Sequence, residues 1–296
     1  MYIIFEVKVM ENKIVLITGA TGGIGKAAAF ELARQGARVI IHGRNAVRAT
    51  VVQQEILNTH PHAQVDILIA DLFLQSEVRR MANDFLSRYD RLDVLINNAG
   101  CMIGNQREVT SEGHERMLAL NLFAPFLLTA LLMPALRNSA SARIINVSSS
   151  SHRETARPDF NDLAGEHNYA PLRTYGNSKL FLILVSQWLV HRLHSLGVRH
   201  VSVNTVHPGA VASEFLNGKD LGALLNFAMK TFRFLFKTPE QGADTLVFLA
   251  SSPAVESITG KYFINRKLAR VAARYNSRQN EEVVWQFCEE KTGVAL

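Results

Sequence analysis

The feature that most constrains the fold is a regular alternation of short apolar segments and helical patterns along the first 205 residues. The segments predicted as strands are 14–18, 38–42, 64–70, 92–97, 143–148 and 200–205. Helical patterns fill the intervals at 24–35, 46–58, 75–89, 112–137 and 174–195. Strands that alternate with helices form a parallel sheet covered on both faces. We therefore predict an α/β fold with a doubly wound parallel sheet of about seven strands, built as one domain over residues 1–296.

Charge and cysteine content set limits on the surroundings of this domain. The net charge of +6 favours anionic partners but does not distinguish nucleic acid, a membrane surface or a phosphorylated small molecule. Cys101 and Cys288 are too few for a disulfide framework, which fits a reducing compartment such as the cytoplasm. A second possible start, Met10, follows residues 1–9, so we consider these nine residues a candidate extension outside the fold.

One stretch is long and apolar enough to cross a bilayer. Residues 117–136 carry no formal charge. They nevertheless contain Asn121, Pro125 and Pro134, and they lie between motifs that belong to one soluble site. We therefore predict a buried helix rather than a membrane span.

The first predicted strand runs into a glycine-rich turn, in which Gly19, Gly23 and Gly25 follow Thr18 in the pattern T-G-x-x-x-G-x-G. Glycines allow a tight turn and a close approach of the backbone to a diphosphate. The next helix would present unpaired N–H groups and the positive end of its dipole to the phosphates. Such a turn alone is weak evidence, but a strand before it and a helix after it are what a Rossmann-type dinucleotide site requires.

Tyr175 and Lys179 are four residues apart, so a helix places both side chains on one face. A free phenol, with a pKa of about 10, is a poor acid–base catalyst near neutral pH. A nearby ammonium favours the phenolate, so we predict that Lys179 lowers the pKa of Tyr175. The same spacing is common on exposed helices, and the pair gains weight only from the other motifs.

Together these motifs resemble the short-chain dehydrogenase/reductase family. The resemblance covers almost the whole chain, because Asp71-Leu72, Asn97-Asn98-Ala99-Gly100, Ser149 and Pro208-Gly209 stand in the family's order. It implies a nicotinamide-dependent oxidoreductase in which Tyr175 exchanges a proton with the substrate oxygen and Lys179 also binds the nicotinamide ribose. It selects Ser149, rather than Ser148 or Ser150, to orient that oxygen. The cofactor-binding residues that follow are Thr18, Gly19, Thr21, Gly23, Ile24, Gly25, Arg44, Asn45, Asp71, Leu72, Asn98, Ala99, Gly100, Tyr175, Lys179, Pro208, Gly209, Val211 and Ser213.

The end of the second predicted strand bears on the choice of cofactor. An acid near this point usually binds the ribose hydroxyls of NAD, but no Asp or Glu occurs between Glu31 and Glu55. Arg44 is instead placed to bind the 2′-phosphate of NADP. A solvated surface arginine is the alternative. With the acid missing, we predict NADP(H) in preference to NAD(H).

Asn121, which the resemblance adds to the catalytic set of Ser149, Tyr175 and Lys179, carries a prediction of its own. Pro125 has no N–H with which to bond the Asn121 carbonyl, so we expect a free carbonyl and a kinked helix. In the family, the matching carbonyl binds a water that links to the catalytic lysine. The alternative is an Asn side chain satisfied within a core helix.

Cys101 directly follows the Asn98–Gly100 motif, near the expected cofactor. No basic partner is identifiable for its thiol in the sequence. We therefore interpret Cys101 as a small buried residue and not as a nucleophile.

The last third of the chain is expected to shape the substrate pocket. We predict a lid over residues 210–237 and a C-terminal extension over residues 265–296. Within 221–237, Lys230, Arg233 and Lys237 share one helical face. Two interpretations compete: an apolar lid with a solvated basic edge, which we favour, and an interfacial helix in peripheral contact with anionic lipid.

Further motifs narrow the resemblance. Residues 238–243, 260–263 and Trp285…Cys288 are similar to the retinol dehydrogenase/WW-domain oxidoreductase branch, which implies retinoids, lipid aldehydes and other hydrophobic carbonyls. We therefore predict an NADP(H)-dependent enzyme that interconverts a hydrophobic alcohol and its aldehyde or ketone. The alternatives are a steroid or other secondary-alcohol dehydrogenase and, in another class, a non-catalytic NADP(H)-binding regulatory protein.

The sequence leads to three expectations about binding partners. The ten histidines show no metal-ligand spacing, so we predict no metal. We expect no nucleic-acid partner. The long apolar helices that carry Asn121 and Tyr175 are candidates to pack against a second subunit in a homodimer.

Overall fold

The structure is a computed structural model that describes residues 9–104, 106–211 and 237–296. Its eight strands form one sheet in the order β3-β2-β1-β4-β5-β6-β7-β8. The strands are β1 (Ile14–Ile17), β2 (Arg38–Gly43), β3 (Gln64–Ile69), β4 (Val94–Asn97), β5 (Ala142–Val147), β6 (Val201–His207), β7 (Tyr262–Ile264) and β8 (Lys267–Ala269). All neighbours are parallel except β7 and β8. The doubly wound α/β prediction is confirmed, with one strand more than expected.

The additional strand, β8, lies in the predicted C-terminal extension. Asn265 and Arg266 join β7 to β8, and both have positive φ, at 50° and 61°. This conformation is that of a type I′ hairpin turn, whose twist matches that of antiparallel strands. The extension therefore contributes to the sheet itself.

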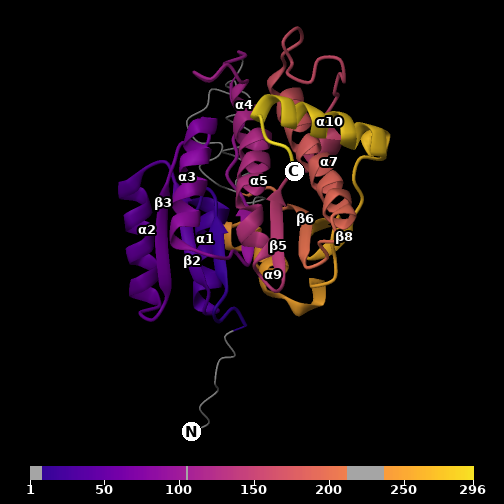
Figure 1. Ribbon diagram of the computed structural model, residues 1–296. Helices are drawn as coiled ribbons and strands as arrows, with labels where there is room; N and C mark the ends of the chain where they lie inside the picture. The colour runs from indigo at the N-terminus through magenta and orange to yellow at the C-terminus, as the bar shows by residue number, and fades with distance from the viewer. Residues whose placement is uncertain (1–8, 105, 212–236) are drawn as a thin grey trace.

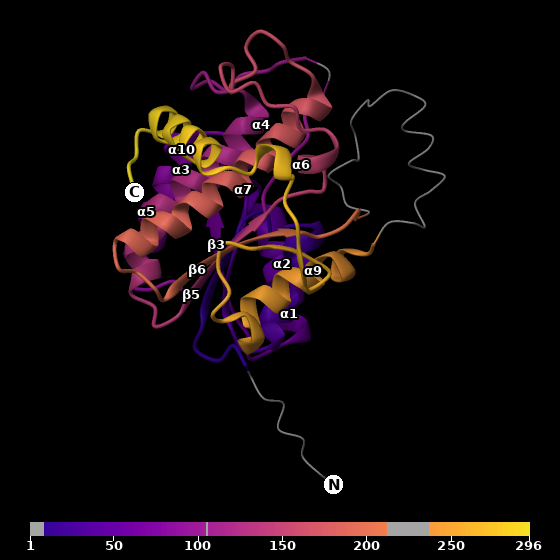
Figure 2. The ribbon, with the colours of Figure 1, turned by 90° about the vertical axis from the view of Figure 1, so that its right-hand side faces the viewer.

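Helices cover both faces of the sheet (Figures 1 and 2). One apolar core lies beneath α1 (Gly23–Arg34), α2 (Ala46–Thr59) and α9 (Pro239–Ser251). The other core lies beneath α3 (Gln75–Arg88), α5 (Ala124–Arg137) and α7 (Pro171–Ser195). Shorter helical segments are α4 (Arg116–Leu118), α6 (Ser151–Glu154), and single 3₁₀ turns at Pro253–Val255 and Ala273–Tyr275.

The helix expected at 112–137 begins later and changes its hydrogen-bond register. The Glu115 carboxylate accepts bonds from the N–H groups of Met117 and Leu118, at 2.9 and 2.8 Å, and so caps the start of α4. A π-helical turn, Ala119–Phe123, then separates α4 from α5. Pro125 stands at the start of α5, where its missing N–H breaks the α-helical register. The expected irregularity at Asn121 is therefore a π-helical turn.

The continuous helical stretch Arg116–Arg137 is, among the described residues, the one helix long and apolar enough to cross a membrane by length and composition. However, 83% of its apolar window is buried inside the protein. This burial agrees with the prediction of a core helix.

The C-terminal helix α10 (Arg278–Thr292) packs across α7, as both ribbon views show. Its Trp285 ring lies 4.8 Å from that of Phe126 on α5, and its Phe287 ring lies 5.4 Å from that of Phe123. Trp285 and Cys288 are buried. Helix α10 thus covers part of the α5 and α7 surface that we considered, from the sequence, as a candidate contact with a second subunit.

Candidate active site

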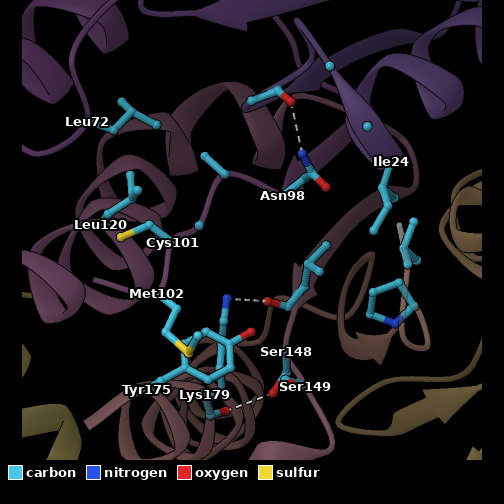
Figure 3. Close-up of a pocket in the computed structure, with 18 of the residues that line it drawn as sticks. Ile24, Leu72, Asn98, Cys101, Met102, Leu120, Ser148, Ser149, Tyr175 and Lys179 are labelled. Carbon is cyan, nitrogen blue, oxygen red and sulfur yellow. Dashed lines mark hydrogen bonds between the residues drawn. The ribbon is translucent and has the colours of Figure 1, made fainter. Parts of the chain in front are cut away.

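A cleft of about 1190 Å³ lies along the carboxyl edge of the sheet, where β1 and β4 are neighbours although two strands separate them in sequence. Ligands bind at such a switch point in open α/β sheets. Figure 3 shows Ser149, Tyr175 and Lys179 grouped in this cleft, and Ile24 and Asn98 farther along it. The predicted site residues that line it are Gly19, Thr21, Gly23, Ile24, Arg44, Asn45, Asp71, Leu72, Asn98, Ala99, Gly100, Ser149, Tyr175, Lys179, Pro208, Gly209 and Val211.

Three predicted residues in the described part of the chain do not line the cleft. Thr18, Gly25 and Asn121 lie behind its wall. Ser213 lies outside the described residues, as do Lys230, Arg233 and most of the predicted lid. Direct cofactor contacts by Thr18 and Gly25 stay predictions, and the contacts that the structure shows for these two residues lie inside the protein.

Thr18 joins the first and fourth strands. Its hydroxyl accepts hydrogen bonds from the N–H groups of Asn98 and Ala99, at 2.9 and 3.0 Å. The Asn98 amide in turn donates to the Thr18 carbonyl at 2.8 Å. The Thr18 hydroxyl is occupied inside the protein, so it shapes the cleft wall rather than reaching a ligand.

The glycine-rich turn allows the first helix to approach the sheet closely. A Cβ on Gly25 would lie 2.5 Å from both the Asn98 amide nitrogen and the Gly19 carbonyl oxygen, closer than atoms pack. Gly19 has φ of +65°, a conformation that side chains disfavour. Helix α1 begins after Gly22 without a side-chain cap. Its first N–H groups and dipole end therefore face the cleft, as anion binding requires.

His42 supports this turn, and the sequence analysis missed it. Its Nδ1 accepts a bond from Gly19 N–H at 3.2 Å, and its Nε2 lies 3.1 Å from the Ala70 carbonyl oxygen. A carbonyl can only accept, so Nε2 carries the proton. Burial lowers the pKa of His42 to about 4. In the sequence, His42 ends the predicted strand 38–42 and precedes a glycine, which is a signal that could have been noticed. The residues that it bonds, Gly19 and Ala70, are distant in sequence.

Two cations and a helix end gather at the carboxyl end of β2. Arg44 and Arg48 both line the cleft. The Asn45 side chain accepts a bond from the Arg48 N–H at 3.0 Å and so caps α2. The Phe73 ring stands between two guanidinium groups, 5.8 Å from that of Arg44 and 4.8 Å from that of Arg116. This corner is positively charged, and Arg48 and Arg116 are additions to the sequence-based set.

At the other end of the cleft, Tyr175 and Lys179 share one face of α7, as their spacing predicted. The Lys179 ammonium lies 5.9 Å from the Tyr175 ring centroid and donates to the Val147 carbonyl at 3.0 Å. Burial raises the pKa of Tyr175 to about 12, against a hydrogen bond with Ser149 that lowers it. Burial also lowers the pKa of Lys179 to about 8. The pKa of Tyr175 is therefore raised by its burial rather than lowered, and the prediction that the Lys179 ammonium favours the phenolate stays a prediction.

The serine turn separates the roles of its first two members. Ser148 is buried, and its hydroxyl donates to the Lys179 carbonyl at 2.8 Å. Both residues line the cleft, but the Ser149 hydroxyl bonds with Tyr175. Of these two hydroxyls, the one of Ser149 faces the space where a substrate oxygen would lie.

Gly176 brings the serine turn and the tyrosine together. A Cβ at this position would lie 2.6 Å from the Ala156 nitrogen and 2.8 Å from the Ser151 carbonyl oxygen. The absence of a side chain therefore lets α7 lie directly against the chain that follows Ser149. The glycine stands beside Tyr175 in the sequence, but its spacing gave no sign of this contact.

Asn121 connects the fourth strand's loop to α7 through its side chain. Its Oδ1 accepts from Cys101 N–H at 2.9 Å, and its Nδ2 donates to the Cys101 carbonyl at 2.8 Å and to Ser178 Oγ at 3.0 Å. These contacts match the core-satisfied alternative for the side chain. The water relay through the Asn121 backbone carbonyl stays a prediction.

The walls beside Tyr175 are largely apolar. Met102, Ile103, Leu120 and Leu172 line this part of the cleft. Cys101 also lines it and is half-buried, so its interpretation as a buried residue is wrong.

Comparison with known proteins agrees with this geometry. The model of the family described as short chain dehydrogenase matches residues 13–221. The chain is 37% identical to retinol dehydrogenase 12 of Mus musculus, covering 96% of this chain and 87% of that protein. It is 35% identical to human polyprenol dehydrogenase, with coverages of 96% and 86%.

Solved structures show the same fold. An uncharacterised protein from Mycobacterium paratuberculosis superposes with a TM-score of 0.76 at 27% identity, covering 96% of this chain and 94% of that one. The Pseudomonas aeruginosa RhlG/NADP active-site complex superposes with a TM-score of 0.69 at 26% identity, with coverages of 87% and 96%.

Proposed function

The chain belongs to the short chain dehydrogenase family, in a retinol dehydrogenase-like branch, and from this premise we propose an NADP(H)-dependent oxidoreductase that interconverts a hydrophobic alcohol and its aldehyde or ketone. One observation carries the proposal. A single cleft holds a frame for a diphosphate at one end and the group of Ser149, Tyr175 and Lys179 at the other. A dinucleotide that spans the cleft would bring its nicotinamide to the tyrosine.

The phosphate end fits a dinucleotide. The uncapped start of α1 offers N–H groups to a diphosphate, and the clash of a Cβ at Gly25 with Asn98 and Gly19 marks how tightly the turn is built. Arg44, Arg48 and the start of α2 form a positively charged corner that suits an additional phosphate. This corner, together with the missing acid, supports NADP(H) over NAD(H).

The catalytic residues have distinct proton-transfer roles. A bound nicotinamide cofactor supplies or accepts the hydride at its C4 atom. Because burial holds the pKa of Tyr175 at about 12, the tyrosine is a protonated phenol at neutral pH and can donate its proton to a carbonyl oxygen during reduction. In oxidation the phenolate must form, and the Lys179 ammonium would stabilise it. Ser149 would orient the substrate oxygen, and Asn121 would extend the proton path from Lys179.

The substrate class follows from the cleft walls and the relatives. Met102, Ile103, Leu120 and Leu172 offer apolar contact beside Tyr175. Two relatives are named retinol dehydrogenase and polyprenol dehydrogenase, and retinol and polyprenols are hydrophobic alcohols. We infer a hydrophobic small-molecule substrate, a cytoplasmic location, and peripheral membrane contact through residues 221–237 as a further hypothesis.

The test is a screen of NADPH consumption by the purified full chain with retinal, aliphatic aldehydes, steroid ketones and quinones, run in parallel with NADH. We expect turnover of at least one hydrophobic aldehyde or ketone, faster with NADPH. Turnover of steroid ketones alone would favour the secondary-alcohol alternative. Binding of NADPH without turnover of any compound would favour a regulatory protein, and equal kcat/KM with NADH would contradict the cofactor assignment.

A further inference from the structure

We propose that His152 is a positioning residue for Ser149, whose carbonyl it holds so that the Ser149 hydroxyl stays directed at Tyr175. The inference rests on the proposed function, because it concerns how the catalytic serine is kept in place. His152 lies on α6, immediately behind the serine turn, and does not line the cleft.

The contact between His152 and Ser149 is short and double. His152 Nδ1 lies 2.6 Å from the Ser149 carbonyl oxygen, and the His152 backbone N–H donates to the same oxygen at 3.3 Å. A carbonyl oxygen only accepts, so Nδ1 carries the proton and Nε2 is a lone-pair acceptor in the neutral ring. Burial lowers the pKa of His152, which keeps the ring neutral near pH 7.

The other side of the ring makes the assignment stronger. The His152 ring is fully buried and packs edge-on against Tyr262, with ring centroids 4.9 Å apart. His152 Nε2 and the Tyr262 hydroxyl are both buried and have no hydrogen-bond partner among the described residues. An unpaired buried polar atom destabilises the folded state, so an apolar residue of similar shape would suit this position better on stability alone. The hydrogen bond from His152 Nδ1 to the Ser149 carbonyl is therefore the contact that favours a histidine here.

The rest of the serine turn shows why this anchor matters. Ser150 N–H donates to His207 Nδ1 at 3.3 Å, and Ser151 N–H donates to the Ser149 hydroxyl at 3.2 Å. The Ser149 carbonyl and the Ser150 N–H belong to one peptide group, so His207 holds its N–H side and the His152 ring holds its C=O side. Without the His152 ring bond, the C=O side keeps only the 3.3 Å contact with the His152 backbone N–H, and the peptide can turn and displace the Ser149 hydroxyl. A displacement of about 1 Å in a reacting group can reduce a rate about 100-fold.

The experiment compares His152→Asn with His152→Leu. The two side chains have a similar shape, and the Asn amide nitrogen sits on Cγ as Nδ1 does in histidine, so Asn keeps a donor that Leu lacks, together with an added amide oxygen. We expect His152→Leu to lower kcat about 10- to 100-fold with the best aldehyde from the screen, and His152→Asn to restore it to within about threefold of wild type. The Kd for NADPH, measured by fluorescence, should change less than about twofold in either variant.

Two further variants separate positioning from packing. Tyr262→Phe keeps the edge-on ring and removes its unpaired hydroxyl, so kcat should remain within about twofold. In a Ser149→Ala background, His152→Leu should lower kcat no further, because groups that act as one unit are not additive. If His152→Leu fails to fold, His152→Phe replaces it and preserves the contact with Tyr262.

The outcomes distinguish this inference from the function on which it rests. Equal kcat in the Leu and Asn variants, or a full additional loss in the Ser149→Ala background, would overturn the role of His152 alone. A wild-type protein that turns over no compound would overturn the proposed function and the role of His152 with it.

Discussion

The two ends of the cleft differ in the groups that form them: mainly backbone at one end and side chains at the other. At the phosphate end, the surface comes from the backbone of a glycine-rich turn, the open start of α1 and the cations Arg44 and Arg48. At the catalytic end, it comes from the side chains of Ser149, Tyr175 and Lys179, of which the first two are half-buried and Lys179 is buried and bonded to the Val147 carbonyl. The phosphate end offers shape and charge, whereas the catalytic end offers polar side chains beside apolar walls.

This difference teaches where each end is sensitive. An end made of backbone is sensitive to added atoms where the turn is tightly packed, as at Gly25. An end made of buried polar groups has its proton affinities set by desolvation, as the pKa values of about 12 for Tyr175 and about 8 for Lys179 illustrate. His42 shares a feature with both ends: it lies beneath the phosphate turn, but it is a buried polar side chain like Lys179 at the catalytic end.

The largest effect should come from the catalytic end. Tyr175→Phe removes the proton donor and keeps the ring, so kcat should fall roughly 10²- to 10⁴-fold. The NADPH dissociation constant should rise less than about tenfold, because at most one hydrogen bond to the cofactor is lost. The matched control is Tyr89→Phe, whose hydroxyl bonds to Asp66 on β3, remote from the cleft. Unchanged kcat in Tyr175→Phe would contradict the mechanism.

His42 should make the free energy of unfolding depend on pH, although it lies at the phosphate end. Its pKa of about 4 lies below the ordinary value of 6.5, so the unfolded chain binds more protons between these values. The stability contribution is therefore present above pH 6.5 and lost as pH falls towards 4. In His42→Asn, the amide oxygen can still accept from Gly19 N–H but does not titrate. Urea unfolding across this window should show wild type losing ~3 kcal/mol more than the variant. Parallel pH profiles would disprove the assignment.

The cations at the phosphate end should affect one cofactor only. Arg44→Ala should lower kcat/KM with NADPH roughly 10- to 100-fold, since a hydrogen bond to a charged group is worth about 1.5–3 kcal/mol, and leave kcat/KM with NADH nearly unchanged. Arg48→Ala should act in the same direction. Arg38→Ala, at the opposite end of β2, is the control. Equal losses with both cofactors would indicate a structural role.

The smallest effect should test the backbone itself. Gly25→Ala places a Cβ against Asn98 and Gly19 and should lower the free energy of unfolding by about 1–3 kcal/mol. Gly22→Ala is the matched control, because a Cβ there meets nothing within 4 Å. It should change stability by less than about 0.5 kcal/mol. Urea unfolding without cofactor measures both, and equal losses would break the contrast between the two glycines.

The sequence by itself determined the features that depend on local pattern. The strand and helix alternation predicts the doubly wound sheet, since each period reflects which face a segment buries. The Gly19–Gly25 turn and the Tyr175–Lys179 spacing are likewise short-range, and the structure places both at one cleft. Element ends were less certain: Glu115 and Pro125 together turned one expected helix into α4, a π-helical turn and α5.

Tertiary structure decided the rest, because burial and contacts between distant residues leave no local signature. It raised the pKa of Tyr175, where the sequence suggested a lower one, because desolvation depends on the atoms packed around the phenol. It moved Thr18 and Gly25 behind the cleft wall and placed His42, Gly176 and His152 in support of the two ends. The partners of these residues lie on other elements, so their roles became visible only when the chain had brought those elements together.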